Sequence, residues 1–318
     1  MAETLFDFIA CQRERLEDAL NEWLPVSSQS GAGRLNDALR YAVFPGGKRL
    51  RPIFTLLGAS LSGAHPRQAM ASACAIEFLH NSSLILDDLP GMDDANVRRN
   101  RTTLHLVYGE GIAVLAAVAL LNQAYALLVQ SAVDAERPGA VEALMKEAAQ
   151  CIGADGMIGG QVVDLGSAGN GSYTERLASR DLKTIALMRL MMVCGALARG
   201  ADARDIEALA KFGECLGRAY QICDDLLDEL GEMRLTGKPA GQDARHLRPN
   251  ALAGMGLESA HQMGTRLIEE AKRALNERFG TRREVCLLAE AADLVIGEVE
   301  RVGPVRRARV AQGAVSLR

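Results

Sequence analysis

This 318-residue chain has few aromatic residues and no excess of positive charge. Aromatics make up 4% of the residues, with a single tryptophan, whereas β-sandwiches and barrels use more aromatic and β-branched side chains. The 36 Lys and Arg residues against 40 Asp and Glu give a formal net charge of −4. Sequence-independent nucleic-acid binding needs a basic face. The composition therefore disfavours an all-β fold, and we expect no nucleic-acid partner.

The sequence also lacks the cysteine spacing of a disulfide-rich protein and the pattern of a signal peptide. The seven cysteines are widely spaced and include no Cys-x-x-Cys pair, so neither a disulfide framework nor a structural zinc site is expected. The N-terminal residues lack the basic and long apolar regions of a signal peptide. The longest uninterrupted apolar run, 112–121, has ten residues, fewer than the roughly 18 of a membrane span. We therefore expect a cytoplasmic protein with no membrane span.

Apolar residues recur every three or four positions along most of the chain, which is the pattern of amphipathic helices. Links rich in Gly, Pro, Ser and Asn separate segments at about 3–24, 34–44, 50–62, 66–89, 110–131, 139–160, 173–199, 203–230, 257–279 and 282–302. No alternating strand pattern lies between two turn signals. The sequence predicts an all-α fold, a single large bundle of about ten or more helices. We expect one domain over 1–318, with a frayed basic tail at 306–318.

Two acidic clusters interrupt the apolar helical pattern. They contain Asp87, Asp88, Asp93 and Asp94, and Asp224, Asp225 and Asp228. Asp224 and Asp228 lie four residues apart and so share one helix face. A solvated acidic face would explain one such cluster, but two clusters beside apolar runs need a counter-ion, because unpaired charge near a bundle interior is costly. Oxygen ligands without His or Cys select Mg²⁺ or a similar ion.

Pro90 and Gly91 separate the carboxylates of the first cluster. In one continuous helix Asp93 would point to a different face from Asp87. Pro and Gly can interrupt the helix and let Asp93 turn back towards the same ion. A plain helix-terminating turn explains the Pro and Gly, but it does not explain the carboxylates on both sides.

Basic segments alternate with the acidic clusters. The loop 46–52 carries three cations, Arg98 and Arg99 follow the first cluster, and Lys238 follows the second. Each segment alone also fits a solvated loop, and none is a P-loop. Their order suits two diphosphate groups around bridging metals, because Arg gives bidentate contacts and Lys a point charge.

With these segments, the chain resembles the trans-isoprenyl diphosphate synthases of the polyprenyl synthetase family over about residues 35–260. GGKRLRP at 46–52, DDx4D at 87–93 with the Arg pair, GGQxxD at 159–164, Lys183-Thr184, QxxDDxxD at 221–228 and GKPxGQD at 237–243 occur in the family's order. The resemblance implies a bundle around a central deep apolar cavity and a homodimer. It also implies head-to-tail condensation of isopentenyl diphosphate with an allylic diphosphate, through Mg²⁺-assisted ionisation to a carbocation.

The resemblance also implies residue roles. Asp87, Asp93 and Asp224 would bind metal, with Asp88 and Asp228 supporting them. The metal would be three Mg²⁺ ions bridged by diphosphate. Catalytic roles fall to Asp87, Asp88, Asp93, Lys183 and Asp224. The allylic substrate is contacted by Arg98, Lys183, Thr184, Gln221 and Lys238. Isopentenyl diphosphate is held by Lys48, Arg51, His80 and Arg99. A buried structural role is the alternative for His80 taken alone.

Product length depends on what blocks the growing tail. Ser82 lies five residues before Asp87, about 7.5 Å along a helix, where farnesyl-making bacterial relatives tend to carry an aromatic residue. Ser82 and Ser83 leave room for a longer tail, and Phe78 with Leu79 forms the next floor. We therefore expect a geranylgeranyl diphosphate synthase, with a farnesyl diphosphate synthase as the alternative.

Two other functions are less favoured. A class I terpene cyclase does not need a second diphosphate site, yet the cations for one, among them Lys48 and Arg51, are present. A non-catalytic synthase subunit typically loses the aspartate motifs, and both are intact here.

Overall fold

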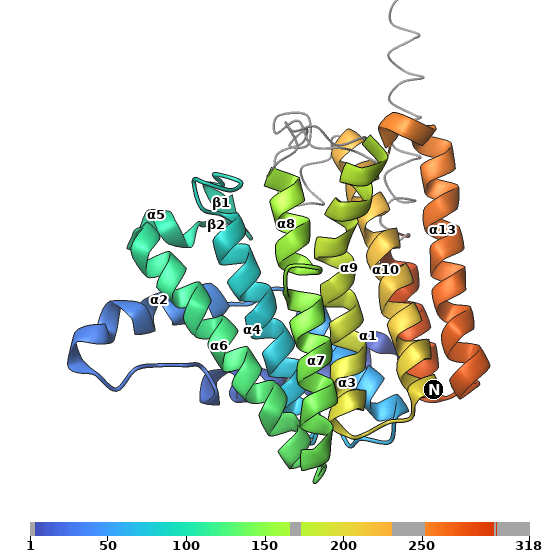
Figure 1. Ribbon diagram of the computed structural model, residues 1–318, viewed down its shortest axis with the longest axis horizontal. Coiled ribbons are helices and arrows are strands. Elements are labelled where there is room, and N and C mark those ends of the chain that lie inside the picture. Colours follow the sequence, from blue (N-terminus) through green and yellow to red (C-terminus); the bar gives the residue numbers. More distant parts are fainter. Residues whose placement is uncertain (1–3, 166–172, 231–251, 296, 298–318) are drawn as a thin grey trace, which may run out of the picture.

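The computed structural model describes residues 4–165, 173–230, 252–295 and 297, except for the side chains of 173–181, 228–230 and 252–255. The α-helices described in it are α1 (Leu5–Glu22), α2 (Gly33–Val43), α3 (Leu50–Leu61), α4 (Met70–Asp87), α5 (Leu104–Tyr108), α6 (Glu110–Asp134), α7 (Val141–Ile152), α8 (Met157–Leu165), α9 (Tyr173–Ala198), α10 (Ala203–Leu230) and α13 (Leu252–Phe279). A further helical segment covers 283–295. Short 3₁₀ turns (Ser30–Ala32 and Pro138–Ala140) and a two-stranded hairpin, β1 (Val97–Arg98) with β2 (Arg101–Thr102), complete the described chain. The predicted all-α bundle is confirmed (Figure 1).

The long helices run alongside one another and share one hydrophobic core (Figure 1). The most extensive contacts join α10 to α13 and α9, and α4 to α6, while α3 packs on α9. Glycines allow the close crossing of α3 and α9. A Cβ at Gly58 would lie 2.6 Å from the carbonyl oxygen of Met192, and one at Gly195 would lie 2.6 Å from Cβ of Ala59. Larger residues at either glycine would force these two helices apart.

The segment predicted as one helix over 139–160 is two helices, α7 and α8, and this prediction was wrong in its boundaries. Gly153 has an extended backbone, with ψ of −163°, and ends α7. The chain then turns so tightly that a Cβ at Gly156 would lie 2.1 Å from the carbonyl oxygen of Cys151. Apolar periodicity continues through this turn, which is why the pattern did not predict the break.

The first acidic cluster forms a turn at the end of α4. Pro90 cannot continue the helix, and the Asp93 backbone N–H instead donates to the carbonyl oxygen of Asp87 at 2.8 Å. The predicted return of Asp93 towards Asp87 is therefore confirmed for the backbone. Arg99 and Asn100, with φ of 52° and 61°, form the left-handed turn of the hairpin that follows. This hairpin lies beside the end of α4 (Figure 1).

One helix in the described part of the chain, α6, is long and apolar enough to cross a membrane by length and composition. Core helices pass the same test, so this is weak support for a span. In this structure α6 packs along α4 and also contacts α2, α5, α7 and α9. Only 39% of its most apolar window is buried, so the helix also carries an exposed apolar face.

Candidate active site

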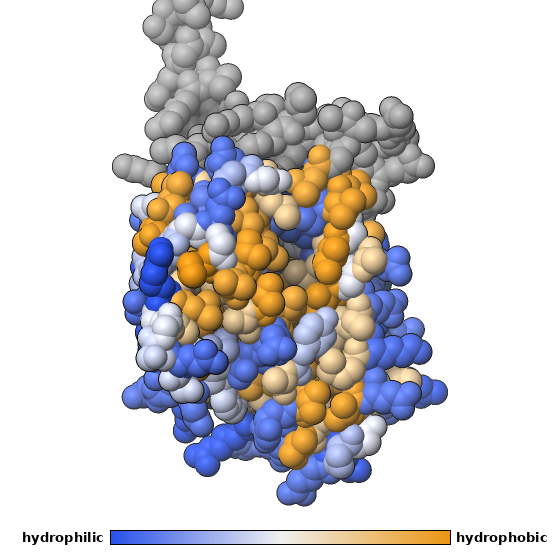
Figure 2. All heavy atoms as spheres, turned by 60° about the vertical axis from the view of Figure 1, so that its left-hand side comes forward, coloured by the Kyte–Doolittle hydropathy of each residue, from blue (hydrophilic) through white to orange (hydrophobic). Residues whose placement is uncertain are grey.

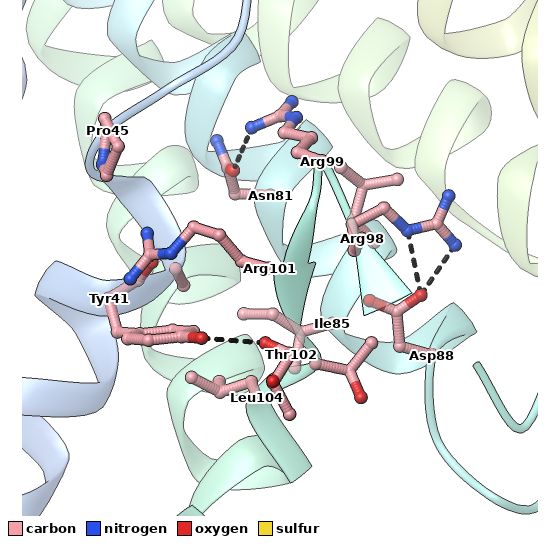
Figure 3. Close-up of a pocket in the computed structure, with 13 residues that line it drawn as sticks. Tyr41, Pro45, Asn81, Ile85, Asp88, Arg98, Arg99, Arg101, Thr102 and Leu104 are labelled. Atoms are coloured by element: carbon pink, nitrogen blue, oxygen red, sulfur yellow. Dashed lines mark hydrogen bonds and ion pairs between the residues drawn. The ribbon is translucent and has the colours of Figure 1, made fainter. Parts of the chain in front are cut away.

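The carboxylates at the end of α4 are buried and each is paired with a cation. Lys183 Nζ, from α9, donates to Asp87 Oδ1 at 2.8 Å. Arg98 Nε and Nη2, from β1, donate to Asp88 Oδ1 at 2.9 and 2.6 Å (Figure 3). Burial raises the pKa of Asp87 and of Asp88, and repulsion from Asp93 adds to this, while Lys183 and Arg98 act in the opposite direction. The structure therefore brings these predicted residues together.

The second acidic cluster is attached to the same turn of α9. Thr184 Oγ1 donates to Gln221 Oε1 on α10 at 3.2 Å, and Gln221 Nε2 donates to Asp225 Oδ1 at 3.4 Å. Asp225 is buried and Asp224 is half-buried. Because Lys183 and Thr184 are consecutive residues, one turn of α9 contacts both of the helices that carry the aspartate motifs.

Arg51, His80 and Arg99 form what we term the cationic cluster. Arg51 Nη1 and Arg99 Nη2 each lie 3.2 Å from His80 Nε2. Guanidinium groups only donate hydrogen bonds, so Nε2 accepts from both, and the imidazole is the neutral tautomer protonated on Nδ1. Burial, followed by the charges of Arg51 and Arg99, holds the pKa of His80 well below its usual range.

The cationic cluster retains an unused donor. Arg51 Nε is buried and has no hydrogen-bond partner among the described residues. The exposed Lys48 lies in the loop that enters α3, three residues before Arg51. Two adjacent guanidinium groups, one of which keeps an unused donor, suit a multiply charged anion.

Arg49 and Glu77 are site residues to which sequence reasoning assigned no role. The Arg49 side chain is buried, and its Nη1 lies 2.5 Å from Glu77 Oε1. Its Nε and Nη2 donate to the two oxygens of Glu17 on α1, both at 3.0 Å. Arg49 has a φ of 54°, a left-handed conformation that turns it into the core while its neighbours stay near the surface. A third basic residue in a short loop was the only signal in the sequence.

The predicted chain-length residues lie along α4 between the acidic turn and the core. Ser82 is buried and its Oγ donates to the carbonyl oxygen of Ala117 on α6 at 2.9 Å. Ser83 Oγ donates within α4 to the carbonyl oxygen of His80 at 2.9 Å. Phe78 and Leu79, one turn further, are fully enclosed in the hydrophobic core. Figure 2 shows a hollow flanked by hydrophobic residues on the face that includes α6.

A pocket with polar and apolar lining residues lies between α2, α4 and the hairpin (Figure 3). Arg99 and Asp88 line it, as does Arg101, whose guanidinium stacks on the Tyr41 ring at 3.8 Å. The pocket thus connects the acidic turn with the cationic cluster.

Three predictions fall outside what the structure describes. These are the roles of Lys238 and of the tail 306–318, together with that of the Asp228 side chain.

The donor set at the two acidic clusters fits a hard divalent ion. Within the described side chains, no group of three His, Cys, Asp or Glu residues stands close enough to hold a metal by itself. Mg²⁺ commonly binds one or two carboxylates and completes its shell with water and substrate phosphates. Mutual repulsion between Asp87, Asp88 and Asp93 also favours a cation at this position.

The helical bundle and its paired acidic helices define a protein of the isoprenoid synthase type. The family model described as polyprenyl synthetase matches residues 32–285. The chain belongs to the polyprenyl synthetase family, whose members are prenyltransferases.

Relatives and solved structures agree with this assignment. The chain is 38% identical to the chloroplastic geranylgeranyl pyrophosphate synthase of Capsicum annuum, over 81% of this chain and 70% of the relative. It is 35% identical to the heterodimeric geranylgeranyl pyrophosphate synthase large subunit 2 of Arabidopsis thaliana, over 89% of this chain and 74% of the relative. The crystal structure of an FPP/GFPP synthase from Zymomonas mobilis matches with a TM-score of 0.80 at 29% identity, covering 93% of this chain and 100% of that one.

Proposed function

We propose that the protein condenses isopentenyl diphosphate with an allylic diphosphate, head to tail, to give geranylgeranyl diphosphate. The observation that carries this proposal is the α9 turn, where Lys183 contacts Asp87 and Thr184 contacts Gln221. It joins the two acidic helices, and His80 of the cationic cluster lies seven residues before Asp87 on α4, about 10.5 Å along the helix. Two diphosphate sites at this separation suit a two-substrate reaction.

In the proposed reaction the allylic C–O bond breaks, leaving a carbocation and pyrophosphate. The double bond of isopentenyl diphosphate attacks this carbocation, which forms a C–C bond and a second carbocation. That carbocation loses a proton to the released pyrophosphate, and a new double bond forms. Asp87, Asp93 and Asp224 would hold Mg²⁺, which would neutralise charge on the departing diphosphate. Arg98 and Lys183 add cationic contacts there, while buried apolar side chains exclude water from the carbocation.

The second substrate is assigned to the cationic cluster. Arg51 and Arg99 hold the diphosphate of isopentenyl diphosphate, assisted by Lys48. His80 stays neutral and aligns the two guanidinium groups by accepting a hydrogen bond from each. This keeps both arginines free to donate their remaining N–H groups to phosphate oxygens.

One assay tests the reaction. The protein is incubated with Mg²⁺, labelled isopentenyl diphosphate and C5, C10 or C15 allylic primers, and the dephosphorylated products are separated by chromatography. We expect a C20 product as the main species. A complete lack of chain extension from all three primers would contradict the proposed reaction. Cyclic hydrocarbon from geranylgeranyl diphosphate alone would instead indicate a terpene cyclase.

The C20 length is supported by the small side chains on α4. Ser82 and Ser83 stand where a bulky side chain would block a tail, and Phe78 lies one turn deeper. The Capsicum relative is named a geranylgeranyl pyrophosphate synthase, whereas the Zymomonas structure is named an FPP/GFPP synthase. A C15 main product would favour the farnesyl alternative.

We also propose that the protein is a homodimer that pairs through α6. Leu115 and Val118 are 56% and 53% exposed on this helix, and Leu106 and Val107 of α5 extend the apolar surface. Figure 2 shows hydrophobic residues gathered on this face. A second copy would cover them. Light scattering should give twice the chain mass, and Leu115→Glu with Val118→Glu should give the monomer mass. A wild-type monomer, or binding to lipid vesicles instead, would contradict a dimer at this face.

A cytoplasmic location is part of the proposal. All seven cysteines are free thiols, five of them buried. Free buried thiols suit a reducing compartment.

A further inference from the structure

Asn81 connects the cationic cluster to the buried Arg49–Glu77 pair. Its side chain is 2% exposed, on α4 directly after His80. Asn81 Nδ2 donates to the carbonyl oxygen of Glu77 at 2.7 Å and to Glu77 Oε1 at 3.1 Å. Both partners are acceptors, so the amide nitrogen must face Glu77 and the amide oxygen must face the opposite way.

The amide oxygen of Asn81 faces Arg99. Arg99 Nη1 lies 3.4 Å from Asn81 Oδ1 (Figure 3). Arg99 Nη2 lies 3.2 Å from His80 Nε2. His80 and Asn81, which are consecutive residues of α4, therefore accept hydrogen bonds from the two terminal nitrogens of Arg99. This matters because Arg99 comes from a tight hairpin turn, whose backbone alone would not fix the end of a long side chain.

Glu77 fixes the orientation of Asn81 without occupying the anion site. Its carboxylate is held by Arg49 at 2.5 Å, and Arg49 is held in turn by Glu17. Glu77 also supplies negative charge that offsets part of the repulsion on Arg99 from Arg49, Arg51 and Arg98. The buried network thus stabilises a group of like charges while their outer N–H groups remain available.

We propose that Asn81 is a positioning residue for the diphosphate of isopentenyl diphosphate. It acts through Arg99, and its own orientation is set by the Arg49–Glu77 pair. The inference rests on the proposed function, because it takes the cationic cluster as the site of isopentenyl diphosphate. Among the described contacts, Asn81 bonds to Arg99 and Glu77 but not to Arg98, Lys183 or Thr184. Its effect is therefore confined to one of the two substrates.

The test compares Asn81→Leu and Asn81→Ala with wild type. Ser72→Ala is the matched control, because Ser72 is a buried polar residue on the same helix, nine residues away. Isopentenyl diphosphate alone does not react, so calorimetric titration without an allylic partner measures its Kd independently of turnover. Steady-state kinetics then give kcat and the KM of each substrate, and thermal unfolding gives Tm.

For both Asn81 variants, the Kd and the KM of isopentenyl diphosphate should rise about tenfold, the size of one lost hydrogen bond to a charged group. The allylic KM and kcat should stay within about twofold of wild type, and Ser72→Ala should change neither KM. Equal weakening of both substrates, or an unchanged Kd for isopentenyl diphosphate, would overturn the inference. Absence of turnover in the wild type would instead overturn the proposed function, while the Kd comparison would still decide the role of Asn81.

Discussion

The acidic turn at 87–94 and the cationic cluster both adjoin α4, but their charged side chains are paired differently. At the acidic turn each buried carboxylate is paired directly, Asp87 with Lys183 and Asp88 with Arg98. In the cationic cluster two guanidinium groups share a neutral imidazole, and Arg51 Nε stays unpaired among the described residues. One region pairs its buried carboxylates with cations of the chain, whereas the other keeps an excess of positive charge.

The difference indicates how each region binds a diphosphate. Carboxylates repel phosphate, so the acidic turn can bind one only through cations, whether metal ions or Lys183 and Arg98. The cationic cluster can bind phosphate directly through N–H donors. The buried support beneath it, Arg49 with Glu77, allows like charges to stay together in the absence of substrate.

The largest expected effect comes from breaking the acidic turn. Asp87→Asn removes a carboxylate proposed to bind metal and leaves Lys183 without its charged partner. We expect kcat to fall about 10³-fold, with little change in the Kd of isopentenyl diphosphate. Asp18→Asn, on the exposed side of α1, is the charge-matched control. A loss of kcat below tenfold would mean that the acidic turn does not assist ionisation.

The next largest effect is on stability, from breaking the support of the cationic cluster. Glu77→Leu leaves the buried Arg49 with Glu17 alone, so the free energy of unfolding should fall by about 3 kcal/mol or more in urea titrations. Glu277→Ala is the control, because its contact with Arg273 is 4.0 Å long and both side chains are exposed. If the free energy of unfolding fell by similar amounts in the two variants, the buried Arg49–Glu77 pair would stabilise the protein no more than the exposed pair does.

A smaller, pH-dependent effect distinguishes the neutral imidazole from a cation. In the folded protein the pKa of His80 lies below the unfolded value of about 6.5. As pH falls below this value the unfolded chain binds a proton that the folded protein does not. The stability of the fold is therefore greatest above this pH and decreases below it. His80→Gln keeps an acceptor for both arginines and cannot be protonated. Between pH 7 and pH 5 the wild type should lose stability relative to this variant, by up to about 1.4 kcal/mol per pH unit. If the free energies of unfolding of the wild type and of His80→Gln changed in parallel with pH, His80 would not be held neutral.

The smallest effect on turnover is expected between the two regions, at Ser82. Phenylalanine there adds bulk beside α6 one turn above Phe78, so the main product should shorten from C20 towards C15 with most activity retained. Chromatography of the product alcohols measures this. Unchanged chain length would show that Ser82 does not face the growing tail.

The sequence predicted the helices well because apolar periodicity is a local property. It predicted the return of Asp93 for the same reason, since Pro90 and Gly91 act on their own turn. It did not predict the turn at 153–156, which depends on close backbone contacts rather than on the apolar pattern.

The partners within the site were less predictable. Arg98 was expected to contact the allylic substrate, and the structure pairs it with Asp88, a contact that no spacing rule indicates. Arg49 and Asn81 act through neighbours that are close only in the folded bundle. Glu77 is 28 residues from Arg49, and Arg99 is 18 residues from Asn81.

Calorimetry of each substrate with and without Mg²⁺ shows whether the acidic turn binds a diphosphate through metal and the cationic cluster binds one without it. Isopentenyl diphosphate and geranyl diphosphate are titrated separately into wild-type protein, in Mg²⁺ and in a metal chelator. We expect the Kd of isopentenyl diphosphate to change by less than about threefold, and the affinity for geranyl diphosphate to fall more than about tenfold without metal. Equal dependence of both substrates on Mg²⁺ would contradict this expectation.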